Sequence, residues 1–142
     1  MIRPRTKVHA ELYIHAASAA VWRRFTQLQE WPTWYPDVIA TQWREGVGWQ
    51  EGATFQVQAN GERTTQYVIR MVSSESVTVW EAVNPALTVV YSLHCADQVG
   101  GCKVTLTATY HGMAALSLWA RGQRQRRLTA ILAALQQTFE RR

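Results

Sequence analysis

The chain has 142 residues, of which 47% are apolar and 18% charged, and its net charge is +5 at pH 7. These values exclude a disordered chain and predict one globular domain over residues 1–142, with a core large enough to fold alone. There is no apolar run of about 18 residues and no basic, hydrophobic leader, so we expect a soluble, cytoplasmic protein.

The first predicted element is a strand over residues 6–15, because apolar residues occupy every second position from Val8 to Ile14. A helix follows, and Ser18 is the expected N-cap. Its apolar residues recur at helical spacing: Val21, Trp22, Phe25 and Leu28. We expect the helix to end before Trp31-Pro32, since proline disfavours helical geometry in the preceding residue.

The next segment, EWPTWYP at residues 30–36, holds two tryptophans, one tyrosine and two prolines. Proline fixes its own backbone and lacks an N–H group, so this segment is predicted as a short helical turn or loop. Three interpretations remain open for its rings: they belong to the core, they form a patch that binds a partner, or they form the wall of a pocket.

Residues 37–111 predict six further strands, at 37–45, 53–59, 63–72, 76–83, 87–95 and 102–111. The breaks between them are turn signals such as Asn60-Gly61, Asn84-Pro85 and Gly100-Gly101. Connections this short predict a meander of antiparallel hairpins. Residues 113–140 contain no proline and one glycine, so they predict a single long helix.

The register of the last hairpin can be proposed from its pattern. If Cys95 faces Cys102, the apolar residues of both strands share one face, from Leu87 to Cys95 and from Cys102 to Tyr110. The opposite face is then rich in threonine and carries His94 to solvent. A disulfide between the two cysteines is one reading of this pairing, and we favour two buried thiols in a cytosolic protein.

The same reasoning places Tyr67, Ile69 and Met71 on the inner face of the sheet. A three-residue loop with a bulge at Asn60-Gly61 brings Phe55 and Val57 inward as well, whereas a two-residue loop would turn them outward. We favour the bulged loop because it buries the aromatic residues.

In the strand at 76–83, the alternation of Val77 and Val79 favours an inward Glu81. The size of Trp80 favours the opposite orientation, in which Glu81 is a surface charge. An inward Glu81 would have a raised pKa and could act as an acid or base beside Tyr67.

The order of these elements resembles the helix-grip fold of the START-like lipid-binding domains, the birch-pollen-allergen family and the polyketide cyclase/dehydratase-like proteins, grouped as SRPBCC. The segments ELYIHAASAAVWRRFTQLQEWPTWYPDV and GGCKVTLTATYHG carry the resemblance. It implies an α+β fold in which a curved, seven-stranded antiparallel sheet wraps around a long C-terminal helix, with two short helices after the first strand. It also implies a cavity between sheet and helix.

The predicted inner faces and the implied cavity together give a set of candidate ligand-binding residues. The set comprises Trp34, Tyr35, Phe55, Tyr67, Ile69, Val79, Glu81, Tyr91, Leu93, Leu106, Tyr110, Trp119 and Arg124. Such a mainly apolar lining suits a hydrophobic small molecule. The alternative is that these large side chains fill the core themselves.

The long helix also carries Arg124 and Arg127 on or near its apolar stripe, which runs through Met113, Leu116, Ala120, Leu128, Ile131 and Leu135. The two arginines would hold a carboxylate or phosphate in the cavity, or their stems would pass the core edge to reach solvent. We expect no metal site and no cofactor. The histidines and cysteines lack metal-binding spacing, and no nucleotide-binding or hydrolase motif is present.

Three functions compete. The leading hypothesis is binding of a hydrophobic or aromatic, lipid- or polyketide-like small molecule. The second is a cyclase/dehydratase-type enzyme, with Glu81 and Tyr67 or Tyr110 as weak catalytic candidates. The third is contact of the arginine-rich helix with an acidic membrane or a partner protein. No nucleic-acid partner is expected, because the basic residues form no recognised motif. Ligand identity and the choice between monomer and homodimer remain open.

Overall fold

The computed structural model describes residues 5–61, 64–82, 87–112 and 118–140, without the side chains of residues 118 and 119. The described elements are β1 (Arg5–Ile14), α1 (Ser18–Thr26), the 3-10 helix η1 (Leu28–Glu30), α2 (Trp31–Trp34), β2 (Val38–Glu45), β3 (Thr54–Ala59), β4 (Thr65–Ser73), β5 (Val77–Ala82), β6 (Thr88–Gln98), β7 (Gly101–His111) and α3 (Leu118–Glu140). Each strand predicted from the sequence is present, with small differences at its ends.

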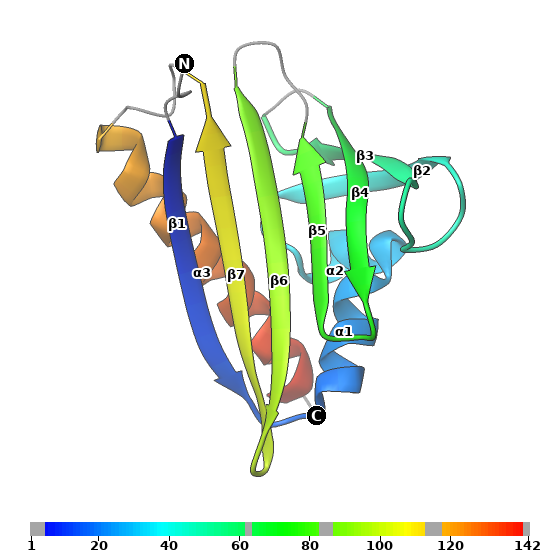
Figure 1. Ribbon diagram of the computed structural model, residues 1–142, viewed down its shortest axis with the longest axis vertical. Coiled ribbons are helices and arrows are strands. Elements are labelled where there is room, and N and C mark those ends of the chain that lie inside the picture. Colours follow the sequence, from blue (N-terminus) through cyan, green and yellow to red (C-terminus); the bar gives the residue numbers. More distant parts are fainter. Residues whose placement is uncertain (1–4, 62–63, 83–86, 113–117, 141–142) are drawn as a thin grey trace.

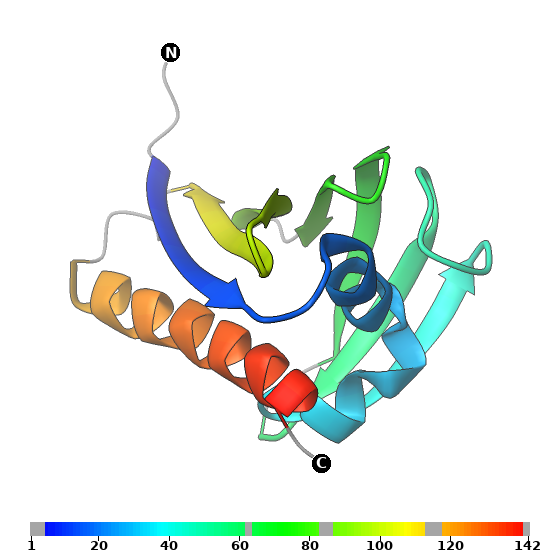
Figure 2. The same cartoon turned by 90° about the horizontal axis from the view of Figure 1, so that it is seen from below.

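The strands form one antiparallel sheet in the order β1-β7-β6-β5-β4-β3-β2. Strands β2 to β7 follow one another as the predicted meander, and β1 joins the sheet beside the last strand, β7. The described helices lie against one face of this curved sheet (Figures 1 and 2): α3 crosses behind β1, β7 and β6, α1 lies behind β4 and β5, and α2 packs against β2. The core therefore lies between the concave face of the sheet and two separate helical groups.

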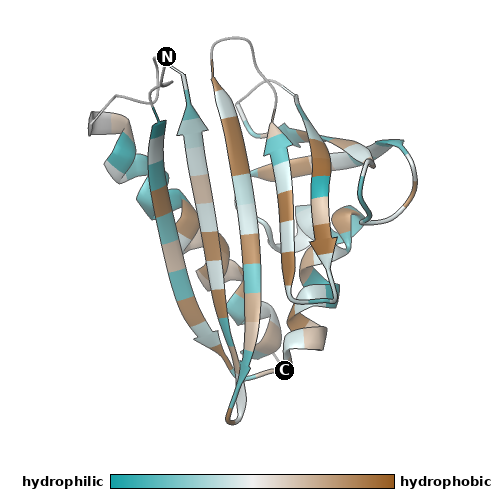
Figure 3. Ribbon diagram, viewed as in Figure 1, coloured by the Kyte–Doolittle hydropathy of each residue, from teal (hydrophilic) through white to brown (hydrophobic). Residues whose placement is uncertain are grey.

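The alternation of apolar and polar residues along β1, β6 and β7 is visible in Figure 3. On β7 every second residue from Cys102 to Tyr110 is buried, while the intervening threonines are partly exposed. On β1, Val8, Ala10 and Ile14 are buried. The predicted inner and outer faces of these strands are thus confirmed.

The predicted register between β6 and β7 is wrong by two residues. Cys95 pairs with Val104, and Cys102 pairs with Asp97, so the two cysteines do not face one another. The faces survive this error because side chains in a strand repeat every two residues. The hairpin closes through Val99 and Gly100 after the pair Gln98–Gly101, and Gly100 has the positive φ of 80° that a tight turn requires. Both cysteines are free and buried.

Of the two orientations left open for β5, the one with Trp80 inward is observed, so Val77, Val79 and Glu81 do not belong to the inner face. In β5 it is Thr78, Trp80 and Ala82 that are buried. An inward Trp80 ring removes more apolar surface from water than an inward Glu81 side chain would. A β-bulge in β4 between Ile69 and Met71 accompanies this pairing.

The bulge also changes which residues of β4 face inward. Ile69 pairs with Trp80 on the inner face, whereas Met71 pairs with Val79 and therefore lies outward, contrary to prediction. Val72 then pairs with the buried Thr78 and packs against the core. Arg70 and Glu81 form an ion pair on the outer face, with 2.8 Å between Nε and Oε2.

Helix α1 buries Val21, Trp22 and Phe25, which is the predicted apolar face. Its N-cap is Ala17 rather than Ser18, and no side chain of the segment caps it. Instead the backbone N–H of Ser18 donates to the carboxylate of Asp97 at 3.3 Å. An acidic group at a helix N-terminus is favoured by the helix dipole, and here it comes from the distant β6–β7 hairpin.

Helix α3 packs on the sheet through Leu128, Ile131, Leu132 and Leu135, each about 1% exposed or less. It is also attached to the edge of the sheet. The side-chain amide of Gln136 donates to the carbonyl of Tyr13 at 3.0 Å, and that of Gln125 donates to the carbonyl of His9. The predicted contributions of Met113 and Leu116 fall outside the described residues.

Candidate functional site

The region between α1, α2 and strands β2 to β5 is filled by aromatic side chains, here named the tryptophan layer. Its members are Phe25, Trp31, Trp34, Trp43, Trp49, Phe55 and Trp80. Phe25 is central, since its ring centroid lies 5.3 Å from that of Trp80, 5.4 Å from Trp31 and 6.0 Å from Trp49. Phe25, Phe55, Trp31 and Trp80 are each no more than 2% exposed, so this part of the space between sheet and helices is occupied by the protein itself.

Two indole groups of the tryptophan layer have hydrogen bonds within the protein. Trp31 Nε1 donates to the carbonyl of Phe25 at 2.7 Å, and Trp49 Nε1 donates to the hydroxyl of Thr78 at 2.8 Å. Trp34 differs: its Nε1 atom is buried and has no hydrogen-bond partner among the described residues. Trp31 is therefore a structural plug, while Trp34 lines a pocket of about 400 Å³ with Arg24, Glu30 and Thr138.

A second group of aromatic residues, the tyrosine–arginine cluster, lies next to the tryptophan layer and beneath α3. It consists of Tyr35, Tyr67, Tyr91, Tyr110, Arg124 and Arg127. Tyr67, Tyr91 and Tyr110 come from the inner face of β4, β6 and β7, and Tyr35 follows α2. Tyr67 stacks on Phe55 and Tyr91 on Trp80, with centroids 5.1 Å and 5.5 Å apart. The two groups thus share one continuous aromatic surface.

Burial dominates the electrostatics of the phenols. It raises the pKa of Tyr35, of Tyr91 and of Tyr110 above the ordinary value of 10.0, because the charged form would lose its hydration. The positive charge of Arg127 opposes this increase in pKa at all three tyrosines. The phenols therefore stay protonated at neutral pH and can act as hydrogen-bond donors.

Tyr91 and Tyr110 are joined by a hydrogen bond between their side chains that lowers the pKa of Tyr110. Tyr91 donates this bond when Tyr110 is ionised, whereas in the neutral pair either hydroxyl can donate. Arg124 covers the same residue from the other side, with its guanidinium carbon 3.9 Å from the centroid of the Tyr110 ring. This is a close cation–π contact, and the Nη1 atom of Arg124 is inaccessible to solvent.

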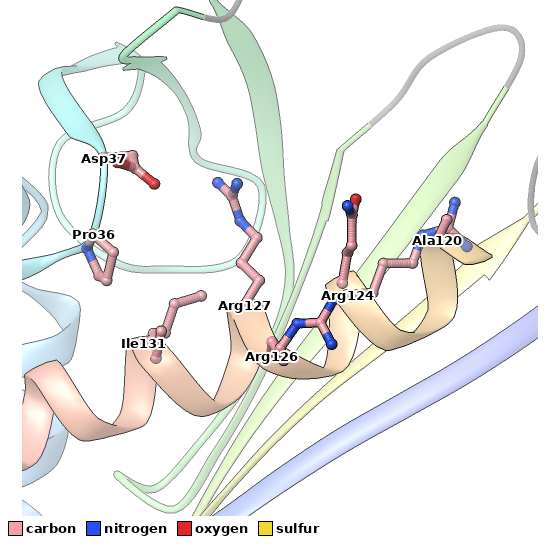
Figure 4. Close-up of a pocket in the computed structure, with 9 residues that line it drawn as sticks. Pro36, Asp37, Ala120, Arg124, Arg126, Arg127 and Ile131 are labelled. Carbon is pink, nitrogen blue, oxygen red and sulfur yellow. The ribbon is translucent and has the colours of Figure 1, made fainter. Parts of the chain in front are cut away.

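A pocket of about 430 Å³ opens between α3 and the segment that joins α2 to β2. It is lined by Pro36, Asp37, Ala120, Gln123, Arg124, Arg126, Arg127, Ala130 and Ile131. Figure 4 shows Pro36 and Asp37 on one side and the residues of α3 on the other, with Arg127 projecting from the helix toward the level of Asp37. Because Arg124 and Arg127 belong both to this lining and to the tyrosine–arginine cluster, the pocket adjoins the buried phenols.

Asp37 holds the turn at the edge of this pocket in an uncommon conformation. Its φ is 65°, in the left-handed region that is costly for most residues and better tolerated by aspartate. The backbone carbonyl of Asp37 accepts a hydrogen bond from the N–H of Asn60 at 2.7 Å, which ties the turn to the end of β3. Backbone strain of this kind is often found at binding sites.

Most of the candidate residues from the sequence lie on the concave side of the sheet or beside it. These are Trp34, Tyr35, Phe55, Tyr67, Ile69, Tyr91, Leu93, Leu106 and Tyr110. Arg124 faces the same region from α3. Leu93, Leu106, Phe55 and Ile69 are completely packed, at 1% exposure or less, so the structure places them in the core and not at the pocket.

Val79 and Glu81 point away from the site. Glu81 pairs with Arg70 on the outer face of the sheet, and its side chain is 21% exposed. The argument for a buried acid or base at this position depended on an apolar environment, which Glu81 does not have. Trp119 lies at the beginning of α3, where the side chains fall outside the described part of the chain.

The sequence analysis did not place Pro36, Asp37 or Trp49 at the site. Pro36 carried a signal only as the last residue of the aromatic segment EWPTWYP, and Asp37 directly follows this segment. Trp49 lies among Gly46, Gly48 and Gly52, all with positive φ, in a loop that folds back so that its ring enters the core. A tryptophan between glycines in a surface loop is the signal that would have indicated this packing.

The described residues give little support for a reactive thiol, a metal site or a membrane-spanning helix. Burial raises the pKa of the Cys95 thiol to about 12, so it is a poor nucleophile. Among residues 5–61, 64–82, 87–112 and 118–140, no three histidine, cysteine or acidic side chains come together as a metal site would require. Over the same residues, none of the helices has the length and apolar character needed to cross a bilayer.

Comparison with solved structures finds the same fold in several proteins of low sequence identity. Norcoclaurine synthase of Thalictrum flavum, as a point mutant with a transition-state analogue, superposes with a TM-score of 0.77 at 12% identity, over 98% of this chain and 96% of that one. Ara h 8.0201 gives 0.78 at 16% identity, over 96% and 98%. These similarities establish the helix-grip fold expected from the sequence, with its sheet wrapped around a C-terminal helix.

A third similar structure is BexL, a di-domain ARO/CYC protein of the BE-7585A biosynthetic pathway. It has a TM-score of 0.79 at 17% identity, over 97% of this chain and 51% of BexL, so this chain corresponds to about one of its two domains. No curated protein matches the chain. The family model described as polyketide cyclase / dehydrase and lipid transport matches residues 5–140. The chain therefore belongs to the polyketide cyclase / dehydrase and lipid transport family.

Proposed function

We propose that the protein binds a hydrophobic or aromatic small molecule in the pocket between α3 and Pro36–Asp37, beside the tyrosine–arginine cluster. One observation carries this proposal: Arg124 and Arg127 line that pocket and also act electrostatically on buried phenols. Arg124 is partly buried, and placing a cation away from water costs free energy. Perturbed titrating groups beside a pocket are typical of functional sites.

The size and lining of the pocket support the same proposal. A volume of about 430 Å³ is within the range of small-molecule sites. Pro36, Ala120, Ala130 and Ile131 provide apolar contact, while the arginines, Gln123 and Asp37 provide a few polar groups. The tryptophan layer fills the neighbouring region, so the proposed ligand lies at the α3 side and not throughout the space within the sheet.

The experiment is a titration with N-phenyl-1-naphthylamine, a neutral aromatic probe whose fluorescence increases in apolar surroundings. We expect saturable binding of one probe per chain. The variant Ala130→Trp places a large ring at an exposed position in the lining and should weaken binding by at least about tenfold. The matched control is Thr129→Trp, because Thr129 is exposed on the same helix and lines a different pocket.

The proposal is overturned if the native protein does not bind the probe, or if both variants weaken binding equally. Native and denaturing mass spectrometry of freshly purified protein would add the identity of the ligand, since a mass lost on denaturation belongs to a bound molecule. An Ala130→Trp protein should then lose that additional mass while the Thr129→Trp protein keeps it.

A second candidate is a cyclase-type reaction, favoured by the hydrogen-bonded pair of Tyr91 and Tyr110. Two phenols that stay protonated in a buried site can polarise a ketone oxygen and so favour attack by a neighbouring carbanion. Tyr110→Phe is then expected to abolish turnover of a poly-β-ketone substrate while leaving the affinity for the naphthylamine probe unchanged. Turnover that survives this change would exclude the role of Tyr110.

A further inference from the structure

We propose that the ligand of this pocket is an apolar organic acid, with its acidic group held by Arg124 and Arg127 and its apolar body against Pro36, Ala130 and Ile131. This inference rests on the proposed function and deepens it by naming the chemical class of the ligand.

The charge of the lining is the first argument. Three arginines and a single aspartate line the pocket, so its potential is positive. Arg124 and Arg127 are one helical turn apart on α3, and residues at this spacing lie on the same side of a helix. A pair of guanidinium groups on one side of a helix is suited to binding a carboxylate, sulfonate or phosphate oxygen.

The distribution of acidic groups is the second argument. Among the described residues every aspartate and glutamate except Glu81 is exposed, and Glu81 lies on the outer face of the sheet with Arg70. The described histidines are on the outer face or exposed as well. Apart from Asp37 and Gln123 in the pocket lining, the polar side chains that the described residues place at the site are arginines and phenols. These donate hydrogen bonds, so a ligand rich in acceptor oxygens is complementary to them.

The pair of Tyr91 and Tyr110 contributes a donor. One of the two phenols uses its hydrogen within the pair, and the other still has its own hydrogen to donate to a ligand. Arg124 lies over the Tyr110 ring at 3.9 Å, so an oxygen bound by Arg124 would be close to Tyr110. The apolar part of the ligand is accommodated by Pro36, Ala130 and Ile131, which face the arginines in Figure 4 or lie beside them on α3.

The test compares two probes of nearly the same shape: 8-anilinonaphthalene-1-sulfonate, which carries an acidic group, and neutral N-phenyl-1-naphthylamine. We expect the sulfonate to bind at least about tenfold more tightly at low salt, and this preference to decrease as salt screens the charges. Arg124→Gln and Arg127→Gln should each weaken sulfonate binding about tenfold or more. Binding of the neutral probe should change less than about twofold, which also shows that the variants are folded.

Arg121→Gln is the matched control. Arg121 is exposed on the same helix and lines a different pocket with Arg5 and Lys7, and its loss lowers the net charge by the same amount. It should leave the affinity for both probes unchanged. Arg124→Lys keeps the charge but loses the planar fork of donors, and its affinity for the sulfonate should fall between those of the native protein and Arg124→Gln.

Competition identifies the source of the acid. 2-Naphthoate or decanoate should displace the sulfonate probe, whereas the corresponding alcohols, 2-naphthalenemethanol and decanol, should not. Whichever acid displaces the probe at the lower concentration shows whether the pocket prefers an aromatic acid or a fatty acid. Equal affinity for both probes, or equal loss in Arg121→Gln and Arg124→Gln, would overturn this inference while the proposed function stands. Failure of both probes to bind would overturn the proposed function itself.

Discussion

The tryptophan layer and the tyrosine–arginine cluster are built from the same kind of residue, but their polar atoms are used differently. In the tryptophan layer, the indoles of Trp31 and Trp49 donate to a carbonyl and a hydroxyl that the fold places in position, and the rings pack against one another. In the tyrosine–arginine cluster, the phenols interact with each other and with two cations that also line a pocket. The aromatic residues of the tryptophan layer thus fill the core, whereas those of the tyrosine–arginine cluster lie beside the charged side chains of a pocket.

The difference teaches that aromatic content alone does not indicate a ligand site in this fold. Both regions lie on the concave face of one sheet, and stacked pairs such as Trp80–Tyr91 join them. What separates them is the presence of charged side chains on the facing helix. Helix α1 contributes Phe25 to the tryptophan layer, whereas the charges of Arg124 and Arg127 on α3 act on the phenols.

The largest expected effect is loss of stability when the tryptophan layer is truncated. Trp80 is 2% exposed and its ring contacts those of Phe25, Trp49 and Tyr91. Trp80→Ala should lower the free energy of unfolding by about 3–5 kcal/mol, because it leaves a cavity among rigid rings. Urea denaturation measures this loss. Tyr110→Phe is the comparison in the other region and should cost about 1 kcal/mol, the contribution of one hydrogen bond. Similar losses in both variants would contradict the division into two regions.

The second effect is a decrease in stability at alkaline pH, arising mainly from the tyrosine–arginine cluster. Folding raises the pKa of Tyr35, Tyr91 and Tyr110 above 10.0, and that of Cys95 from 9.0 to about 12. The folded state therefore holds protons that the unfolded state releases above about pH 9. Stability should be complete below this pH and should fall above it, by about 1.4 kcal/mol per pH unit for each such proton.

Urea unfolding at several pH values between about 8 and about 11 measures this slope. Tyr91→Phe should reduce it by the contribution of one proton, whereas Trp43→Phe in the tryptophan layer should leave it unchanged. A free energy of unfolding that stays constant over this range would show that the phenols are not buried in the folded state.

The third effect is a difference between Trp31 and Trp34, which lie three residues apart in the sequence. Trp31→Phe removes the donor to the Phe25 carbonyl and leaves that buried oxygen without its partner, so it should cost about 1–3 kcal/mol beyond the lost ring area. Trp34→Phe removes an N–H that has no partner among the described residues, so no such additional cost is expected. Equal losses of unfolding free energy would show that Trp34 Nε1 also has an acceptor.

The smallest effect concerns Glu81, the catalytic candidate of the sequence analysis. Its partner Arg70 has a side chain that is 54% exposed, and such surface ion pairs contribute about 0–1 kcal/mol. Glu81→Gln should therefore change stability by less than about 1 kcal/mol and should leave probe binding unchanged. A large loss of binding in this variant would place the site at β5 and not under α3.

The sequence predicted the architecture because its patterns are local. Period-two alternation identified the inner faces of β1, β6 and β7, and turn residues located each hairpin. The register of β6 on β7 was wrong because a slip of two residues leaves every side chain on its original face. The two registers differ in the length of the turn, which consists of Val99 and Gly100 in the structure. The hydrophobic pattern is the same in both registers and therefore could not distinguish them.

The site was less predictable, because it depends on contacts between distant segments. Arg124 was proposed from its place on the helical stripe, and Figure 4 places it in the pocket. The bulge in β4 and the inverted β5 were not visible in the pattern, so Val79 and Glu81 were assigned to the wrong face. Tyr91 lies diagonal to Tyr110 because it pairs with Ala108, a register that differs from the predicted one. The position of Asp37 depends on its contact with Asn60, which is distant in the sequence.

The attachment of α3 to β1 has a consequence for self-association. A strand at the edge of a sheet exposes backbone groups that can pair with a strand of another chain. In β1 the carbonyls of His9 and Tyr13 are already occupied by the side chains of Gln125 and Gln136. At the opposite edge, β2 has irregular pairing between Val38 and Ala40 and again between Trp43 and Glu45. These features oppose the addition of a further strand at the two edges of the sheet.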